Sequence, residues 1–159
     1  MKRQLNLVLN GNGGVGKSFF AVNLVQFLKD KALPFVACDS DNENSTLKRF
    51  HSDAAFIDFS QPRLLDEMSR AFDRTPLVVV DCRAASTDVF LGYFKTIDLS
   101  SVLGLLQARL TVLMPLNHEA DSRCCLALQY PTPQRVRSFW LRRRGPSAFG
   151  SGMRFSVTE

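Results

Sequence analysis

A glycine-rich segment near the start of the chain has the residue types and the spacing to bind phosphate. Residues 11–18 read Gly-Asn-Gly-Gly-Val-Gly-Lys-Ser and fit the phosphate-loop pattern G-x-x-x-x-G-K-[ST]. An apolar run, 5–9, precedes the segment and a helix-forming stretch, 19–28, follows it, so the order is strand, glycine loop, helix. Glycines let successive backbone N–H groups face one anion, and the helix adds the positive end of its dipole. The segment therefore predicts a nucleotide-binding site.

The residues of this loop have separate expected roles. Lys17 is expected to neutralise the β- and γ-phosphate oxygens, and the Ser18 hydroxyl to ligate Mg²⁺. A glycine-rich turn with a chance lysine is the alternative, and the strand, loop and helix order argues against it. The residues expected to contact the nucleotide are Gly11, Asn12, Gly13, Gly14, Val15, Gly16, Lys17, Ser18 and Phe19.

Three aspartates outside the loop are candidates for holding the metal and the attacking group. Asp81 ends the apolar strand candidate 77–81, a position from which a carboxylate reaches the Mg²⁺ shell through water in phosphate-loop enzymes. Asp39 and Asp41 follow the strand candidate 35–38. Because the carboxyl ends of parallel strands share one edge of a sheet, we expect all three aspartates near the nucleotide. A carboxylate there suits the holding of a water for hydrolysis or of an acceptor hydroxyl for kinase chemistry.

These acids also have structural explanations. Asp81 could cap the turn after its strand. The segment around Asp39 and Asp41 could be a polar loop in which Asn44 or Ser45 caps the next helix, and this capping is compatible with a role in binding.

Short apolar runs alternate with longer helix-like stretches between about residues 5 and 122. This alternation predicts an α/β fold with a doubly wound, mostly parallel sheet, in three layers like a Rossmann fold. The run 77–80 is continuously apolar, as expected of a central strand that is covered on both faces. The strand candidates are 5–9, 35–38, 55–58, 77–81 and 110–114, and the helix candidates are 17–30, 44–51, 62–73, 86–96 and 99–108.

Composition indicates an ordinary globular protein. The chain has 159 residues, 45% hydrophobic and 22% charged, which suits one domain with a real core. No apolar run approaches the ~18 residues that span a bilayer, and no signal-peptide segment follows Met1, so we expect a cytoplasmic protein. Its cysteines, Cys38, Cys82, Cys124 and Cys125, lack the spacing of a zinc site and are expected to be reduced and mostly buried.

The positive charge is concentrated at the end of the chain. Residues 123–159 contain seven arginines, no lysine and one acid, a balance of +6, so the net charge of +5 leaves −1 for residues 1–122. The tail has neither helical nor strand periodicity, so we expect a domain over 1–122, incomplete at its C-terminus, and an irregular tail over 123–159. The tail is either a basic arm for nucleic acid or the result of truncation or of a coding frame lost near residue 123. The ordered region itself gives no support for DNA binding.

Three segments together resemble the ParA/MinD superfamily of deviant-Walker P-loop ATPases. They are 13–18, 39–41 and 78–81. Within that superfamily, residues 39–47 and 80–86 are similar to plasmid-borne TraL- and StbB-like proteins of conjugation and plasmid stability. The resemblance covers the chain from residue 1 to about 122.

The resemblance implies an ATPase that binds ATP with Mg²⁺ and hydrolyses it slowly, as a nucleotide switch in plasmid conjugal transfer, partition or stability. It assigns the phosphate and Mg²⁺ grip to residues 13–18, with Lys17 as a catalytic residue, and the positioning of the attacking water to Asp41. It assigns support of the Mg²⁺ shell to Asp39 and Asp81. It also implies a nucleotide-dependent homodimer and partners among plasmid transfer or partition proteins.

One position departs from the family pattern. The superfamily has a signature lysine directly before the Gly-Gly pair, which reaches the phosphates of a dimer partner, whereas this chain has Asn12. An amide can donate a hydrogen bond to phosphate but supplies no charge, so the contact that the family's lysine makes across a dimer lacks its charge here. Two alternatives remain: a small-molecule kinase on the same loop, and a nucleotide-binding adaptor or inactive fragment without useful turnover.

Overall fold

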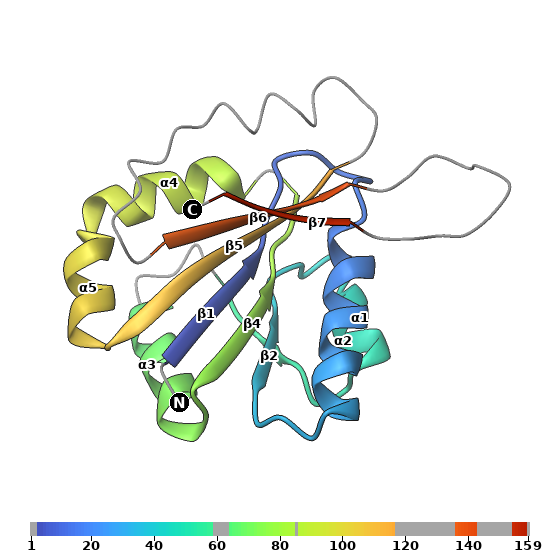
Figure 1. Ribbon diagram of the computed structural model, residues 1–159, viewed down its shortest axis with the longest axis horizontal. Coiled ribbons are helices and arrows are strands. Elements are labelled where there is room, and N and C mark those ends of the chain that lie inside the picture. Colours follow the sequence, from blue (N-terminus) through green and yellow to red (C-terminus); the bar gives the residue numbers. More distant parts are fainter. Residues whose placement is uncertain (1–2, 59–63, 85, 117–135, 143–153, 159) are drawn as a thin grey trace, which may run out of the picture.

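The computed structural model describes residues 3–58, 64–84, 86–116, 136–142 and 154–158. Within them the strands form one sheet in the order β3-β2-β4-β1-β5-β6-β7, with helices on both sides (Figure 1). The strands are β1 (Arg3–Val8), β2 (Val36–Asp39), β3 (Ala55–Phe56), β4 (Leu77–Asp81), β5 (Ala108–Leu116), β6 (Val136–Arg142) and β7 (Arg154–Thr158). The helices are α1 (Lys17–Asp30), α2 (Thr46–Phe50), α3 (Leu64–Arg74), α4 (Thr87–Thr96) and α5 (Leu99–Leu105).

The sheet is parallel from β3 to β6. β1 pairs with β4 and β5, and β2 pairs with β3 and β4, all in parallel register. The chain runs outward from β1 to β2 and β3, returns to place β4 between β2 and β1, and then adds β5 on the other side of β1. Helices make the connections between these strands, as parallel pairing requires. The predicted α/β fold with a doubly wound, mostly parallel sheet is confirmed.

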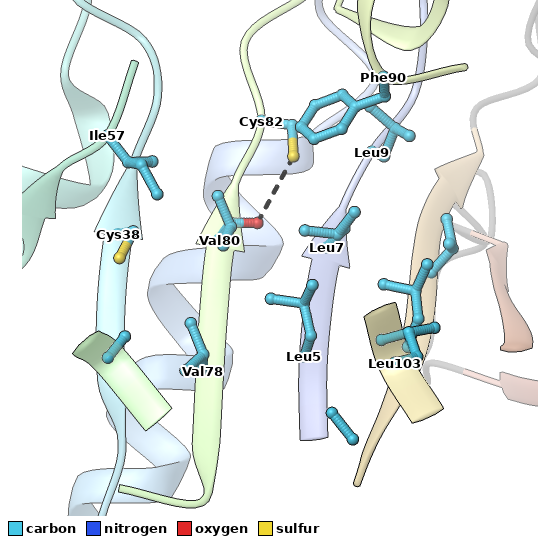
Figure 2. Close-up of a cluster of buried hydrophobic side chains, with 14 of the residues drawn as sticks. Leu5, Leu7, Leu9, Cys38, Ile57, Val78, Val80, Cys82, Phe90 and Leu103 are labelled. Carbon is cyan, nitrogen blue, oxygen red and sulfur yellow. Dashed lines mark hydrogen bonds between the residues drawn. The ribbon is translucent and has the colours of Figure 1, made fainter. Parts of the chain in front are cut away.

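Two apolar layers hold the helices to the sheet. On one face, Val8 and Val79 pack with buried residues of α1 and α2. On the other face, alternate residues of the same strands pack with buried residues of α3, α4 and α5 (Figure 2). The alternation follows from the period of two in a strand, which turns successive side chains to opposite faces. The second layer includes Leu5, Leu7, Leu9, Val78, Val80, Phe90 and Leu103.

The cysteines that the structure describes behave as small apolar residues. Cys38 and Cys82 are buried free thiols in the second layer. Burial raises the pKa of Cys38 to about 12 and that of Cys82 well above its ordinary value, so both stay protonated. The Cys82 thiol donates to the Val80 carbonyl, as the dashed line in Figure 2 shows. Cys124 and Cys125 lie outside the described residues.

Two segments of the tail over 123–159, which the sequence predicts to be irregular, are the strands β6 and β7. β6 pairs in parallel with β5 from Val136 against Leu110 to Arg142 against Leu116, and β7 pairs with β6 in antiparallel register. The far edge of β5 offers unpaired N–H and C=O groups, and backbone pairing to such an edge needs no apolar periodicity in the added strand. Residues 117–135 and 143–153 lie outside the description.

In the part of the chain that the structure describes, we find no helix with the length and apolar character needed to cross a bilayer.

Candidate functional site

The glycine loop joins the carboxyl end of β1 to the first turn of α1. Gly14 and Gly16 have φ angles of 72° and 92°, in the left-handed region that costs other residues about 1–2 kcal/mol. Gly16 also occupies the N-cap position of α1, and its carbonyl accepts the first helical hydrogen bond, from Phe20 N at 2.9 Å. The predicted order of strand, loop and helix is therefore confirmed, and two of its glycines are required by the backbone conformation.

Lys17 lies at the mouth of this loop although its side chain is largely buried. It is 6% exposed, and Nζ donates to the Asn12 carbonyl at 2.6 Å. The ammonium therefore reaches back across the loop that the sequence predicts will hold phosphate. Ser18 is partly exposed on the first turn of α1, and Phe19 is 65% exposed beside it. Lys17 is thus held against the start of the loop, and Phe19 is exposed just beyond its end.

Asn10 holds the loop in place, and sequence reasoning missed it. Its side chain is fully buried: Oδ1 accepts from Asn12 N at 2.9 Å, and Nδ2 donates to the Pro115 carbonyl at 2.8 Å. This one side chain therefore ties the start of the phosphate loop to the end of β5, 105 residues away. A polar residue directly after an apolar strand was the available signal, but its partner depends on strand order.

The predicted convergence of strand ends is confirmed for two of the aspartates. Asp39 and Asp81 are register partners at the ends of β2 and β4, and Val8 of β1 is the partner of Asp81 on its other side. Both carboxylates are buried, with exposed fractions of 0% and 1%. Since partners in parallel strands project from the same face, the two acids lie next to each other at the edge where the glycine loop begins.

Asp81 is a buried carboxylate with no hydrogen-bond partner for either oxygen. Burial, together with the negative charges of Asp39 and Asp41, raises its pKa to about 7. Ser18 and Lys17 act in the opposite direction, which shows that both lie near it, although the Ser18 hydroxyl does not reach hydrogen-bonding geometry. An unsatisfied buried acceptor costs about 1–3 kcal/mol, and more when it is charged, so this site is prepared for a ligand that brings donors or positive charge.

Asp39 uses both carboxylate oxygens to organise the loop that follows β2. Oδ1 accepts from Asp41 N at 3.0 Å, and Oδ2 accepts from Lys48 N at 3.1 Å in the first turn of α2. The second contact satisfies one of the free N–H groups at the start of the helix. Ser45, one of the two alternative caps in the sequence, occupies the N-cap position, but its hydroxyl donates to the Asp41 carbonyl at 2.8 Å and does not cap the helix.

Asp41 lies on the partly exposed side of this loop, with its carboxylate turned toward the loop backbone. Oδ1 accepts from the N–H groups of Glu43 and Asn44, each at 3.0 Å, and Oδ2 accepts from the Asn44 side chain at 3.1 Å. Partial burial alone would raise the pKa of Asp41, but these hydrogen bonds and the charge of Arg83 lower it below its ordinary value. Asp41 is therefore an ionised carboxylate held by the loop that follows β2.

The arrangement suits a metal ion that arrives with phosphate. Among the described residues no three His, Cys, Asp or Glu side chains cluster closely enough to hold an ion by themselves. Mg²⁺ in nucleotide sites keeps several waters and takes only one or two protein ligands, the rest being phosphate oxygens. The Ser18 hydroxyl and the unsatisfied oxygens of Asp81 fit that requirement, the first as a ligand and the second as acceptors for metal-bound water.

Comparison with known proteins gives one result that bears on this site. A family model described as the CobQ/CobB/MinD/ParA nucleotide binding domain matches residues 7–123. The matched range runs from β1 to just beyond β5 and includes the glycine loop and all three aspartates. A search of the curated proteins found no match.

Proposed function

The chain belongs to the CobQ/CobB/MinD/ParA nucleotide-binding domain family, and from this membership we propose that it binds ATP with Mg²⁺ and hydrolyses it slowly. One observation carries the proposal: a buried, unsatisfied carboxylate, Asp81, next to a phosphate loop. A metal ion with its bound waters would supply the donors that both oxygens lack. We assign the phosphate grip to residues 13–18, further nucleotide contacts to Gly11, Asn12 and Phe19, and the metal shell to Ser18, Asp39 and Asp81.

In this proposal the chain's own groups bind and orient the reactants. The backbone N–H groups of the loop and the Lys17 ammonium hold the phosphate oxygens, and the dipole of α1 adds to that attraction. When Mg²⁺ is bound it neutralises charge on the phosphate oxygens. Asp41 holds a water in position for attack, which requires its carboxylate to turn from the N–H groups of Glu43 and Asn44 toward the loop.

We further propose that nucleotide state controls partner choice in plasmid conjugal transfer, partition or stability. Support comes from the similarity of residues 39–47 and 80–86 to TraL- and StbB-like proteins. Slow turnover suits such a switch, because the nucleotide must outlast the encounter with the partner. The domain assigned to this switch is 1–122, and a nucleotide-dependent homodimer is part of the proposal.

A second candidate, an adaptor that binds nucleotide without useful turnover, is favoured by two specific observations. Asn12 supplies no charge where the resembling family has its signature lysine, and the Asp41 carboxylate is satisfied by its own loop. Turnover then requires those hydrogen bonds to break. Both candidates bind nucleotide in the same way and differ only in hydrolysis.

The test of binding compares the parent with two single variants of the full chain. Lys17→Ala should weaken Mg-ATP binding by tenfold to a hundredfold or more in titration calorimetry, since a charged hydrogen bond contributes about 1.5–3 kcal/mol and each tenfold is about 1.4 kcal/mol. Lys31→Ala is the matched control, because Lys31 is exposed beyond the other end of α1. Equal affinities for all these proteins would refute the proposed binding site.

Hydrolysis is tested separately. Asp41→Ala should retain Mg-ATP affinity within a few-fold and lose phosphate release, because it removes the group that positions water and leaves the phosphate grip intact. Turnover at the parental rate would contradict the role of Asp41. A parent chain that binds ATP but releases no phosphate would favour the adaptor.

A further inference from the structure

The candidate site has more negative than positive charge before any nucleotide binds. Asp39, Asp41 and Asp81 gather at the ends of β2 and β4, whereas the glycine loop contributes one cationic side chain, Lys17, because residue 12 is asparagine. A triphosphate brings further negative charge to the same point. Like charges in a partly buried site repel strongly, so positive charge near the terminal phosphate would have a large effect on triphosphate binding.

Arg83 lies two residues beyond β4, and its backbone is fixed on both sides. Its N–H donates to Ser40 Oγ at 3.0 Å, and its carbonyl accepts from Ser86 Oγ at 2.7 Å. Ser40 is itself bound to β4, since its N–H donates to the Asp81 carbonyl at 3.0 Å. The two serines are buried. The backbone of Arg83 is therefore held between the loop after β2 and the start of α4, whereas its side chain is exposed.

Two neighbours place this exposed side chain at the phosphate end of the site. A Cβ atom added to Gly13 would lie 4.0 Å from the Ala84 Cβ, so the segment that carries Arg83 packs against the glycine loop. On the other side, burial raises the pKa of the Asp41 carboxyl and the loop hydrogen bonds lower it, and the guanidinium is close enough for its charge to add to that lowering. Arg83 therefore stands between the phosphate loop and the Asp41 loop.

We propose that Arg83 binds the terminal phosphate of a bound nucleoside triphosphate and so makes the site prefer the triphosphate to the diphosphate. This inference rests on the proposed function. A guanidinium presents parallel N–H groups that match phosphate oxygens and keeps its charge at every physiological pH. It supplies, within the same chain, positive charge that the neutral Asn12 does not provide.

The inference assigns Arg83 a contact with the ligand rather than a structural role. Its described hydrogen bonds, to Ser40 and from Ser86, use backbone atoms, so Arg83→Ala leaves both in place. The variant is therefore expected to fold, which circular dichroism checks. Arg74→Ala is the matched control, because Arg74 is an exposed arginine at the end of α3, before β4 begins, and so belongs to the opposite edge of the sheet.

The experiment titrates the full chain with Mg²⁺ and either a non-hydrolysable ATP analogue or ADP, in calorimetry. Arg83→Ala should bind the triphosphate about tenfold to a hundredfold more weakly and bind ADP within about twofold of the parent. Arg83→Lys should recover part of the triphosphate affinity, and Arg74→Ala should match the parent with both ligands.

The possible outcomes separate this inference from the proposed function. Unchanged triphosphate affinity in Arg83→Ala, or an equal loss for triphosphate and diphosphate, overturns the role of Arg83 and leaves the nucleotide site standing. A gain in affinity would show that Arg83 serves only to pair with Asp41, and overturns it as well. A parent chain that binds neither nucleotide refutes both proposals together.

Discussion

Replacing Asp81 by asparagine should stabilise the ligand-free protein at pH 8, although it removes a residue assigned to the site. The Asp81 carboxylate is 1% exposed and neither oxygen has a hydrogen-bond partner, so its ionised form is poorly accommodated by the fold. Asparagine has nearly the same shape and carries no charge. The variant therefore removes the charge penalty and preserves the packing at the end of β4.

The size of the effect follows from the pKa of Asp81, which burial raises from 3.8 to about 7. Between these two values the folded state binds more protons than the unfolded state, so the free energy of unfolding falls as pH rises from about 4 to about 7 and is level above. At about 1.4 kcal/mol for each pH unit, the raised pKa costs about 4 kcal/mol at pH 8, where the folded carboxyl is ionised, and roughly 2 kcal/mol at pH 5, where only the folded state holds the proton.

Urea unfolding at pH 5 and pH 8, in chelator to exclude divalent ions, measures this penalty. The advantage of Asp81→Asn over the parent should grow by roughly 2–3 kcal/mol between the two pH values. Asp73→Asn is the control, because Asp73 is an exposed acid on α3 and its replacement removes the same charge outside the site. An advantage that does not grow with pH, or an Asp81→Asn protein less stable than the parent at pH 8, would refute the reasoning.

Two further predictions concern the support of the site. Asn10→Ala should lower the free energy of unfolding by about 2 kcal/mol and weaken Mg-ATP binding, because it leaves Asn12 N and the Pro115 carbonyl without their partner. Urea titration measures the first effect and calorimetry the second. An unchanged affinity for Mg-ATP would contradict the role of Asn10. Removal of residues 123–159 should leave Mg-ATP binding in place but reduce stability, because β5 loses its neighbour β6. If the shortened chain still folds by circular dichroism but no longer binds Mg-ATP, the tail is part of the site.

Sequence patterns were sufficient where the information is local. The glycine loop was identified from residues that are adjacent in the chain, and the period of apolar residues located every strand from β1 to β5 within a few residues. The convergence of Asp39 and Asp81 also followed, because parallel strands present their carboxyl ends at one edge whatever their order.

Local patterns were insufficient where a partner comes from elsewhere in the chain. The sequence offered Asn44 or Ser45 as the cap of α2, whereas Asp39, at the end of the preceding strand, accepts from Lys48 N. The tail over 123–159 has no strand periodicity, yet two of its segments pair along β5 and β6. Backbone hydrogen bonding to an open sheet edge does not depend on the side-chain pattern of the added strand.

The sequence by itself determined which groups the chain offers for phosphate chemistry. The loop and the start of the helix form one contiguous segment, and each strand-end acid adjoins its own apolar run. Only the tertiary structure decided which of those groups are buried and which partners they have. The register of β2, β4 and β1 leaves Asp81 buried without donors, and the position of β5 beside β1 gives Asn10 its acceptor 105 residues away. Burial and long-range partners set the pKa of a carboxylate and the rigidity of a loop, and both depend on strand order and register, which local periodicity does not encode.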